Sequence, residues 1–176
     1  MSNFSPRLTA AGIYRNPKWY AKNPFEAAGY GLPNCTTYAW GRAWEIEGQR
    51  PRLPLGDAGT WYDEARRAGI YKTGSVPALG AVICWGKTGG AGHVAVVEEI
   101  HADGSLTTSN SGWYRPISDY PPDTPNYFYT NRTSRDYMEP WMDSRYFFQG
   151  FIYIDRQPEP PKPGKIPVWL LFKIRK

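Results

Sequence analysis

Cysteine and histidine are scarce in this sequence, which holds Cys35, Cys84, His93 and His101 and no others among 176 residues. A structural zinc site takes four such ligands, commonly in close pairs, and these four share no such spacing. We therefore expect no metal and no cofactor. A disulfide between the two cysteines is not expected either, because no export signal is visible and a reducing cytosol keeps thiols free.

Long hydrophobic runs are also missing. No segment approaches the roughly 20 apolar residues that a membrane-spanning helix needs. The opening stretch MSNFSPRLTAAG lacks the basic flank and the apolar run of a Sec signal peptide. Aromatic residues make up 16% of the chain, which excludes wholesale disorder. The 18 glycines and 17 prolines favour loops and short strands over a helical bundle.

Excess charge is small over most of the chain. The net charge is +5, but residues 157–176 hold five basic residues against one acidic residue, which accounts for +4 of it. The other residues together carry only +1, so the sequence predicts no nucleic-acid-binding face on the body of the protein. We expect any affinity for polyanions at the C-terminal end.

The composition divides the chain into three parts. We expect one domain over residues 1–156, beginning with an extended arm over residues 1–33. Residues 157–164, QPEPPKPG, are typical of a semi-stiff proline-rich linker. Residues 165–176, KIPVWLLFKIRK, form a short basic and apolar tail. Three interpretations of this tail stay open: docking on the body, attraction to a wall or membrane surface, or the start of a further domain.

The pattern of apolar residues predicts helices first and an antiparallel sheet afterwards, which is an α+β fold. Asn34 is a good N-cap and Gly48 a plausible stop for the first helix. Helices are expected at 35–47 and 57–68, and strands at 81–85, 93–100, 105–110 and 147–154, with a hairpin turn at 102–104. The long aromatic stretch 111–146 is either an insertion packed by its own side chains, which we favour, or the lining of a substrate groove.

The positions of these residues in the predicted helices and strands favour one Cys–His pair as the catalytic pair. Cys35 begins the first predicted helix, where free backbone N–H groups and the positive end of the helix dipole lower the pKa of a thiol. His93 opens a strand after the glycine-rich TGGAG and is suited to serve as a base. Cys84 lies inside an apolar strand and is expected to be inert packing. His101 falls in the hairpin turn and is expected at the surface.

A histidine base needs a partner that orients its second nitrogen. If His101 faces Gly104 across the hairpin, paired residue numbers sum to 205, and Asn110 becomes the diagonal neighbour of His93 on the same face. An even sum would bring Ser109 or Ser111 to His93 instead. We take Asn110 as the third member of the site.

These residues predict hydrolysis of an amide by a thiol. The Cys35 thiolate attacks the carbonyl, His93 protonates the leaving amine, and Asn110 holds the imidazole. The backbone N–H of Cys35 and the side-chain amide of Asn34 are the expected oxyanion hole. Trp113, Tyr114 and Trp85 are the candidates for lining a substrate groove.

Five segments together resemble the CHAP family, the cysteine- and histidine-dependent amidohydrolases/peptidases of bacterial cell-wall enzymes. They are LPNCTTYAWGRAWEI (32–46), LPLGDAGTWYDEARRAG (53–69), VPALGAVICWG (76–86), GHVAVVEEIHADGSLTTSNSGW (92–113) and FQGFIYI (148–154). The resemblance implies a papain-like α+β fold and hydrolysis of peptidoglycan amide bonds. It places the family's nucleophile on Cys35, its base on His93 and its third polar residue on Asn110.

The sequence departs from the family pattern in three places. The residue before the nucleophile is often Gln and here is Asn34, and the third residue is often Glu and here is Asn110. Some relatives bind calcium through acidic residues just before the cysteine, whereas Glu26 is the only acidic residue in 22–34. Calcium is therefore not expected. The segment FQGFIYI resembles the CHAP domains of bacteriophage endolysins of Gram-positive hosts.

The resemblance implies a phage endolysin-like enzyme that is made in the bacterial cytoplasm and acts on the wall after holin-dependent release. We favour an endopeptidase of the stem peptide or cross-bridge. The alternatives are an N-acetylmuramoyl-L-alanine amidase with the same site, a virion-associated lysin, and a non-catalytic wall-binding module. The expected partners are peptidoglycan and, through the tail, anionic wall polymers or a membrane surface, and no nucleic acid.

Overall fold

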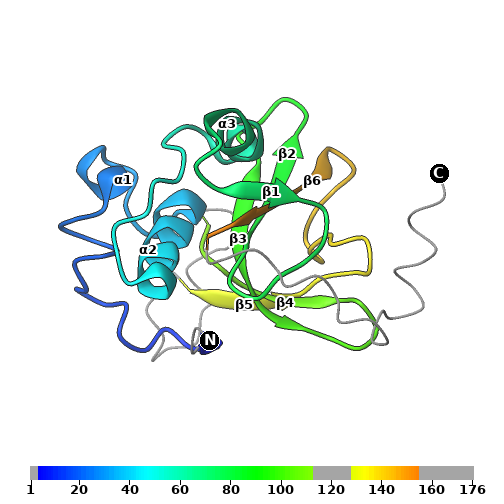
Figure 1. Ribbon diagram of the computed structural model, residues 1–176, viewed down its shortest axis with the longest axis horizontal. Helices are drawn as coiled ribbons and strands as arrows, with labels where there is room; N and C mark the ends of the chain where they lie inside the picture. Colours follow the sequence, from blue (N-terminus) through cyan, green and yellow to red (C-terminus); the bar gives the residue numbers. More distant parts are fainter. Residues whose placement is uncertain (1–3, 113–127, 155–176) are drawn as a thin grey trace.

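A six-stranded sheet organises the computed structural model, which describes residues 4–112 and 128–154 (Figure 1). The strand order is β1-β6-β2-β3-β4-β5, and every neighbouring pair is antiparallel. The bounds are β1 (Lys72–Gly74), β2 (Val82–Lys87), β3 (His93–Ile100), β4 (Leu106–Asn110), β5 (Tyr129–Arg132) and β6 (Tyr146–Tyr153). The last strand therefore lies inside the sheet, between the first two.

The helices come mostly before the sheet in the chain. They are α1 (Pro24–Ala27), α2 (Cys35–Glu47), the 3-10 turn η1 (Ala58–Thr60) and α3 (Trp61–Ala68). The helix predicted at 35–47 is confirmed as α2, with Asn34 as its N-cap and Gly48 ending it in the left-handed region at φ 71°. The helix predicted at 57–68 is confirmed as η1 followed by α3. Figure 1 shows α1 and α2 together at one side of the sheet.

Alternation along the strands gives the sheet two apolar faces. One face, with Val82, Cys84, Val94 and Val96, packs against α2 and α3 and forms the larger core. The opposite face, with Ile83, Trp85, Ala95 and Val97, packs beneath Tyr137. Tyr137 belongs to segment 133–145, which lies away from α2 in Figure 1. The predicted α+β fold with helices packed on an antiparallel sheet is confirmed.

The N-terminal arm, residues 4–33, lies against α2. Trp19 is fully buried there, and its Nε1–H donates to the carbonyl of Tyr38 at 3.2 Å. Gly41 of α2 makes this close approach possible, since a Cβ at that position would lie 2.4 Å from the Trp19 ring. Beneath the arm, Arg42 forms a buried ion pair with Glu98 of β3 at 2.9 Å. The arm is thus part of the packing that holds α2 on the sheet.

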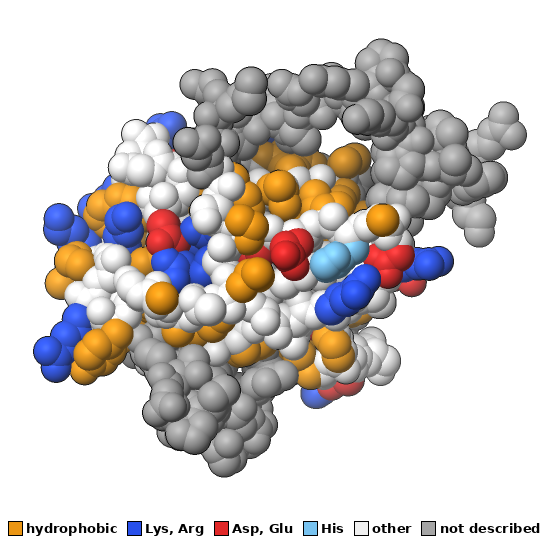
Figure 2. Space-filling model, turned by 90° about the horizontal axis from the view of Figure 1, so that it is seen from below, with side chains coloured by type: hydrophobic (Ala, Val, Ile, Leu, Met, Phe, Trp, Pro, Cys, Tyr) orange, Lys and Arg blue, Asp and Glu red, His pale blue; other side chains and the backbone are white. Residues whose placement is uncertain are grey.

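Charged side chains of both signs are scattered over the face seen in Figure 2, with hydrophobic side chains between them. In the described residues, no helix has the length and apolar character needed to cross a membrane. The predicted linker 157–164 and tail 165–176 lie outside the described residues, and so do Trp113 and Tyr114.

Candidate active site

Cys35 lies at the N-terminus of α2, where the helix leaves backbone N–H groups free. Its thiol is half-buried and contacts the imidazole of His93 through a hydrogen bond. Burial opposes the thiolate, but the hydrogen bond and the positive charge of His93 lower the pKa of Cys35 below its ordinary value. The backbone N–H groups of Val94 and Thr36 act in the same direction. The site therefore favours a thiolate.

Asn34 organises the first turn of α2. Its Oδ1 accepts hydrogen bonds from the backbone N–H groups of Thr36 at 2.9 Å and Thr37 at 3.0 Å. It also accepts from the Thr36 hydroxyl at 2.6 Å. Because the oxygen is used by the cap, Nδ2 is the atom of this side chain left to donate to an oxyanion. The N-cap predicted from the sequence is confirmed, whereas the oxyanion role stays a prediction.

His93 is the first residue of β3 and is 2% exposed. Its Nε2 lies 2.8 Å from Oδ1 of Asn110, which leaves Nδ1 for the thiol of Cys35. Burial lowers the pKa of His93, but hydrogen bonding to Cys35, the negative charges of Cys35 and Glu139, and the bond to Asn110 raise it above its ordinary value. The three residues chosen from the sequence thus lie together in space, and the geometry favours a thiolate–imidazolium pair.

Asn110 lies on the face of His93, as predicted, but the strand register that places it there arises differently from the register assumed in the prediction. At the turn, the His101 carbonyl accepts from the Gly104 N–H and the His101 N–H donates to the Ser105 carbonyl, each at 2.9 Å. His101 thus faces two residues, and the pairs that follow it sum to 206 rather than 205. A β-bulge between Val97 and Glu99 then changes the sum to 205. The bulge restores the parity that brings position 110 onto the face of His93.

The groove position predicted for Trp85 is wrong. Trp85 is fully buried, and its Nε1–H donates to the carbonyl of Tyr137 at 2.8 Å. Trp85 is the cross-strand partner of His93, and the two rings stack with centroids 5.6 Å apart. Cross-strand partners share a face, so this tryptophan supports the histidine from inside the core rather than lining a groove.

A pocket of about 240 Å³ opens beside the thiol. Ala91 and Gly92, which directly precede His93, belong to its lining, and two other lining residues, Tyr30 and Leu55, are 53% and 62% exposed. Its lining residues are Phe25, Tyr30, Asn34, Cys35, Thr36, Leu55, Gly56, Asp57, Ala58, Ala91 and Gly92. Asp57 is the charged side chain among them at neutral pH, apart from the thiolate. The pocket is large enough to receive a peptide side chain next to the nucleophile.

Gly92 permits the close approach of two loops that shape this pocket. Its φ is +75°, and a Cβ there would lie 2.6 Å from the Cα of Gly59 and 2.4 Å from the carbonyl oxygen of Trp85. The N–H of Gly59 donates to the carbonyl of Ala91 at 2.6 Å across the same contact. The glycine next to His93 is thus required by both conformation and space.

Sequence reasoning missed Glu139 and Trp141, which lie in segment 133–145 on the far side of His93. Trp141 contacts His93 edge to face, with ring centroids 5.1 Å apart and planes at 87°. Glu139 is 2% exposed and accepts hydrogen bonds from Trp141, Asn131 and Thr108. Part of the stretch 111–146 therefore packs on the site itself. No spacing pattern in the sequence linked these two residues to His93.

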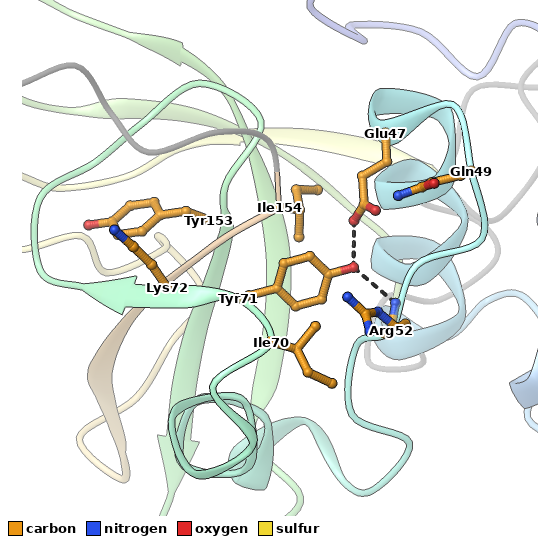
Figure 3. Close-up of a pocket in the computed structure, with 8 residues that line it drawn as sticks. All are labelled: Glu47, Gln49, Arg52, Ile70, Tyr71, Lys72, Tyr153 and Ile154. Carbon is orange, nitrogen blue, oxygen red and sulfur yellow. Dashed lines mark hydrogen bonds between the residues drawn. The ribbon is translucent and has the colours of Figure 1, made fainter.

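A second pocket, of about 300 Å³, lies near the C-terminal end of α2 (Figure 3). Figure 3 shows Tyr71 between Glu47 and Arg52, and its hydroxyl donates to Glu47 Oε1 at 2.6 Å while accepting from the Arg52 N–H at 2.9 Å. Neither cysteine nor histidine is among the described residues that line it. Cys35 lines the first pocket.

The second cysteine has a different environment. Cys84 of β2 is fully buried, and burial raises the pKa of its thiol. Both cysteines are free thiols. In the parts of the chain that the structure describes, no three His, Cys, Asp or Glu side chains gather in the manner of metal ligands.

A cysteine at a helix N-terminus that contacts a histidine on a strand, with an asparagine holding that histidine, is the arrangement of residues found in papain-like thiol hydrolases. The model of the CHAP domain family matches residues 25–112, which is half of the chain. The chain belongs to the CHAP domain family. The matched range contains Cys35, His93 and Asn110 and ends before β5, Glu139 and β6.

Individual relatives share shorter stretches. The chain is 33% identical over 88 residues to a "Putative hydrolase" of Streptococcus mutans, covering 43% of this chain and 41% of that protein. It is 33% identical over 84 residues to "Probable autolysin LDP" of Staphylococcus aureus, covering 48% of this chain and 29% of that protein. The chain thus matches less than half of the length of either relative.

A solved structure is also similar. An N-acetylmuramoyl-L-alanine amidase from Staphylococcus aureus superposes with a TM-score of 0.47 and 24% identity, covering 69% of this chain and 31% of that chain.

Proposed function

We propose that the protein is a cysteine-dependent peptidoglycan hydrolase that cleaves an amide bond of the bacterial cell wall. The observation that carries this proposal is the contact of Cys35 with a buried His93 that Asn110 holds at 2.8 Å. Membership of the CHAP domain family and the similarity to a protein named as an autolysin support peptidoglycan as the substrate. A non-catalytic binding module would need neither the thiolate nor the oriented imidazole.

The first half of the reaction makes an acyl-enzyme. The Cys35 thiolate attacks the carbonyl carbon, and the electron pair of the C=O bond moves onto oxygen. The Cys35 backbone N–H and Asn34 Nδ2 donate to this oxyanion. As the tetrahedral intermediate collapses, the C–N bond breaks and the leaving amine takes the proton from His93, so that a thioester remains.

The second half returns the enzyme to its starting state. Neutral His93 removes a proton from a water molecule, and the resulting hydroxide attacks the thioester carbonyl. The C–S bond breaks, which releases the carboxylic acid and regenerates the thiolate beside the imidazolium. Asn110 accepts from Nε2 throughout and thereby holds Nδ1 toward the sulfur and the leaving group.

Within this chemistry we favour an endopeptidase, which cuts the stem peptide or the cross-bridge. The pocket beside Cys35 combines the apolar side chains of Phe25 and Leu55 with the carboxylate of Asp57. That combination suits a peptide with an aliphatic stem and an amino group. An amidase that cuts between N-acetylmuramic acid and L-alanine uses the same catalytic residues, so the products decide between the two.

The test is digestion of purified walls from Streptococcus mutans and Staphylococcus aureus, the sources of the two curated relatives. Cys35→Ala serves as the matched inactive control, and fragments are identified by mass spectrometry. New termini within the stem or bridge indicate an endopeptidase. Bare glycan strands together with a new amine on L-alanine indicate an amidase. Equal release by the wild type and Cys35→Ala would refute the thiol mechanism.

A further inference from the structure

We propose that Glu139 is a positioning residue of the active site, which acts on His93 through Thr108 and Asn110 and stabilises its imidazolium form. This inference deepens the proposed function and rests on it for the catalytic role of His93. Glu139 lies outside the range matched by the family model, in segment 133–145. It joins the site because that segment folds over the face of the sheet that carries His93.

A continuous chain of hydrogen bonds connects the carboxylate to the imidazole. His93 Nε2 lies 2.8 Å from Asn110 Oδ1, and the Asn110 Nδ2 donates to Thr108 Oγ1 at 2.8 Å. The Thr108 hydroxyl in turn donates to Glu139 Oε1 at 2.6 Å. Asn110 and Thr108 are two residues apart on β4, so their side chains share one face. The amide of Asn110 is therefore held from behind and cannot flip without losing a bond at each end.

The surroundings of Glu139 fit a carboxylate. Its Oε2 accepts from Asn131 Nδ2 at 2.7 Å and from Trp141 Nε1 at 2.6 Å, in addition to the Thr108 bond on Oε1. Three donors and no acceptor point at the two oxygens, which is the pattern that an ionised carboxylate satisfies. Burying a charge costs free energy unless the charge is hydrogen-bonded and paired with an opposite charge. The positive group that this buried charge faces across the relay is the imidazolium of His93.

The same carboxylate fixes a second contact of His93. Trp141 donates to Glu139, and its ring edge packs against the imidazole with centroids 5.1 Å apart. With Trp85 stacked on the ring as well, the imidazole is enclosed by two tryptophans. Glu139 therefore orients His93 through the asparagine and restricts its motion through the tryptophan.

The charges around His93 determine the direction of the expected effect. The ionisable groups that act on it are Cys35 from α2 and Glu139 from segment 133–145, and both raise its pKa when negative. Removing the charge of Glu139 destabilises the imidazolium and lowers the pKa of His93. The alkaline limb of the activity profile should then move to lower pH, because the proton on His93 is lost sooner. The acid limb, which reports formation of the thiolate, should move little.

The chain suits a direct test because it holds only two histidines, His93 and His101. The Cε1–H signal of His93 is followed by NMR across pH in the wild type and in Glu139→Gln, and a His101→Asn variant assigns the two signals. The expected result is a lower pKa of His93 in Glu139→Gln than in the wild type, because a negative charge that favours the imidazolium is lost. The value of kcat should fall by about tenfold with KM little changed, because Glu139 does not line the pocket beside the thiol.

Glu99→Gln is the matched control. Glu99 also accepts a hydrogen bond from a threonine of β4, Thr107, at 2.7 Å, but it lies near the hairpin turn rather than at His93. The same chemical change at this position should leave the His93 titration and the hydrolysis rate at wild-type values. An equal shift in both variants would assign the effect to net charge and overturn the proposal.

A folded Glu139→Gln protein with an unshifted His93 titration would also overturn the proposal. If that variant does not fold, Thr108→Val and Thr108→Ser decide: the hydroxyl-free valine should lower kcat by about tenfold and the serine should restore it. Equal activity of the two would refute the relay. The titration needs no substrate, so a shifted His93 in a protein that cleaves no wall would refute the proposed function alone.

Discussion

Asn34 carries two roles that two substitutions can separate. Its Oδ1 caps α2 through the N–H groups of Thr36 and Thr37, while its Nδ2 is assigned to the oxyanion hole. Asn34→Ala removes both the cap and the amide donor. Asn34→Ser removes the amide but keeps a side-chain oxygen of the type preferred at an N-cap. The two variants therefore share any loss in catalysis and differ in stability.

The structure sets the expected magnitudes. Losing the N-cap costs about 1 kcal/mol of the free energy of unfolding, which for a protein of this size lowers Tm by about 2–4 °C. Asn34→Ala should show this loss, and Asn34→Ser should stay within about 1 °C of the wild type on the same scale. Removing one oxyanion donor lowers kcat by about 10²–10³-fold. Both variants should show that loss, because neither retains Nδ2.

The assay combines thermal unfolding with the initial rate of fragment release from purified wall. Asn110→Ala is a useful comparison, since it removes the 2.8 Å bond to His93 while leaving the cap and the oxyanion donor intact. Wild-type kcat in Asn34→Ser would refute the assignment of Asn34 to the oxyanion hole. Equal Tm values for the serine and alanine variants would refute the stabilising role of the cap.

Three further predictions concern reactivity and packing. At neutral pH iodoacetamide should modify Cys35 alone, because its pKa is lowered whereas burial raises that of Cys84; a doubly alkylated folded protein, seen by mass spectrometry, would contradict this. Gly92→Ala should lower both Tm and kcat, because a Cβ there meets backbone at 2.6 Å, while Gly89→Ala, with φ +69° but open space, should leave kcat unchanged and cost about 1 kcal/mol. Arg42→Met should lower the free energy of unfolding in urea by about 3–5 kcal/mol, since its carboxylate partner becomes a buried, uncompensated charge; a loss below about 1 kcal/mol would argue against that pairing.

The sequence predicted the parts of the fold that depend on local signals. The helix at 35–47 follows from an asparagine cap, a glycine stop and a regular apolar spacing, and its bounds are confirmed. The apolar strands around Cys84 and His93 were found for similar reasons. The short strands β1 and β5 were not predicted, because their residues have little apolar alternation and are held by pairing with β6 and β4.

The catalytic residues could be predicted from the sequence only because cysteine and histidine are rare in it. Two cysteines and two histidines left few choices, and the position at a helix start selected Cys35. Asn110 was selected by assuming a simple hairpin register. In the structure a β-bulge between Val97 and Glu99 produces the pairing that places Asn110 beside His93, and the sequence gives no signal for that bulge. Glu139 could not be found, since its role depends on which face of the sheet segment 133–145 covers. Trp85 was wrongly predicted to line the groove for the same reason, because the sequence does not show that this segment covers its face of the sheet.

The place of β6 between β1 and β2 has a consequence for synthesis on the ribosome. Cys35, His93 and Asn110 all emerge early, but β2 and β1 are joined only through β6, at residues 146–153. Until that strand emerges, the sheet exists as separate pieces with unpaired edges. Pairing across such a long sequence separation also slows folding. The sheet is therefore completed only once translation has passed β6, long after Cys35 has been synthesised.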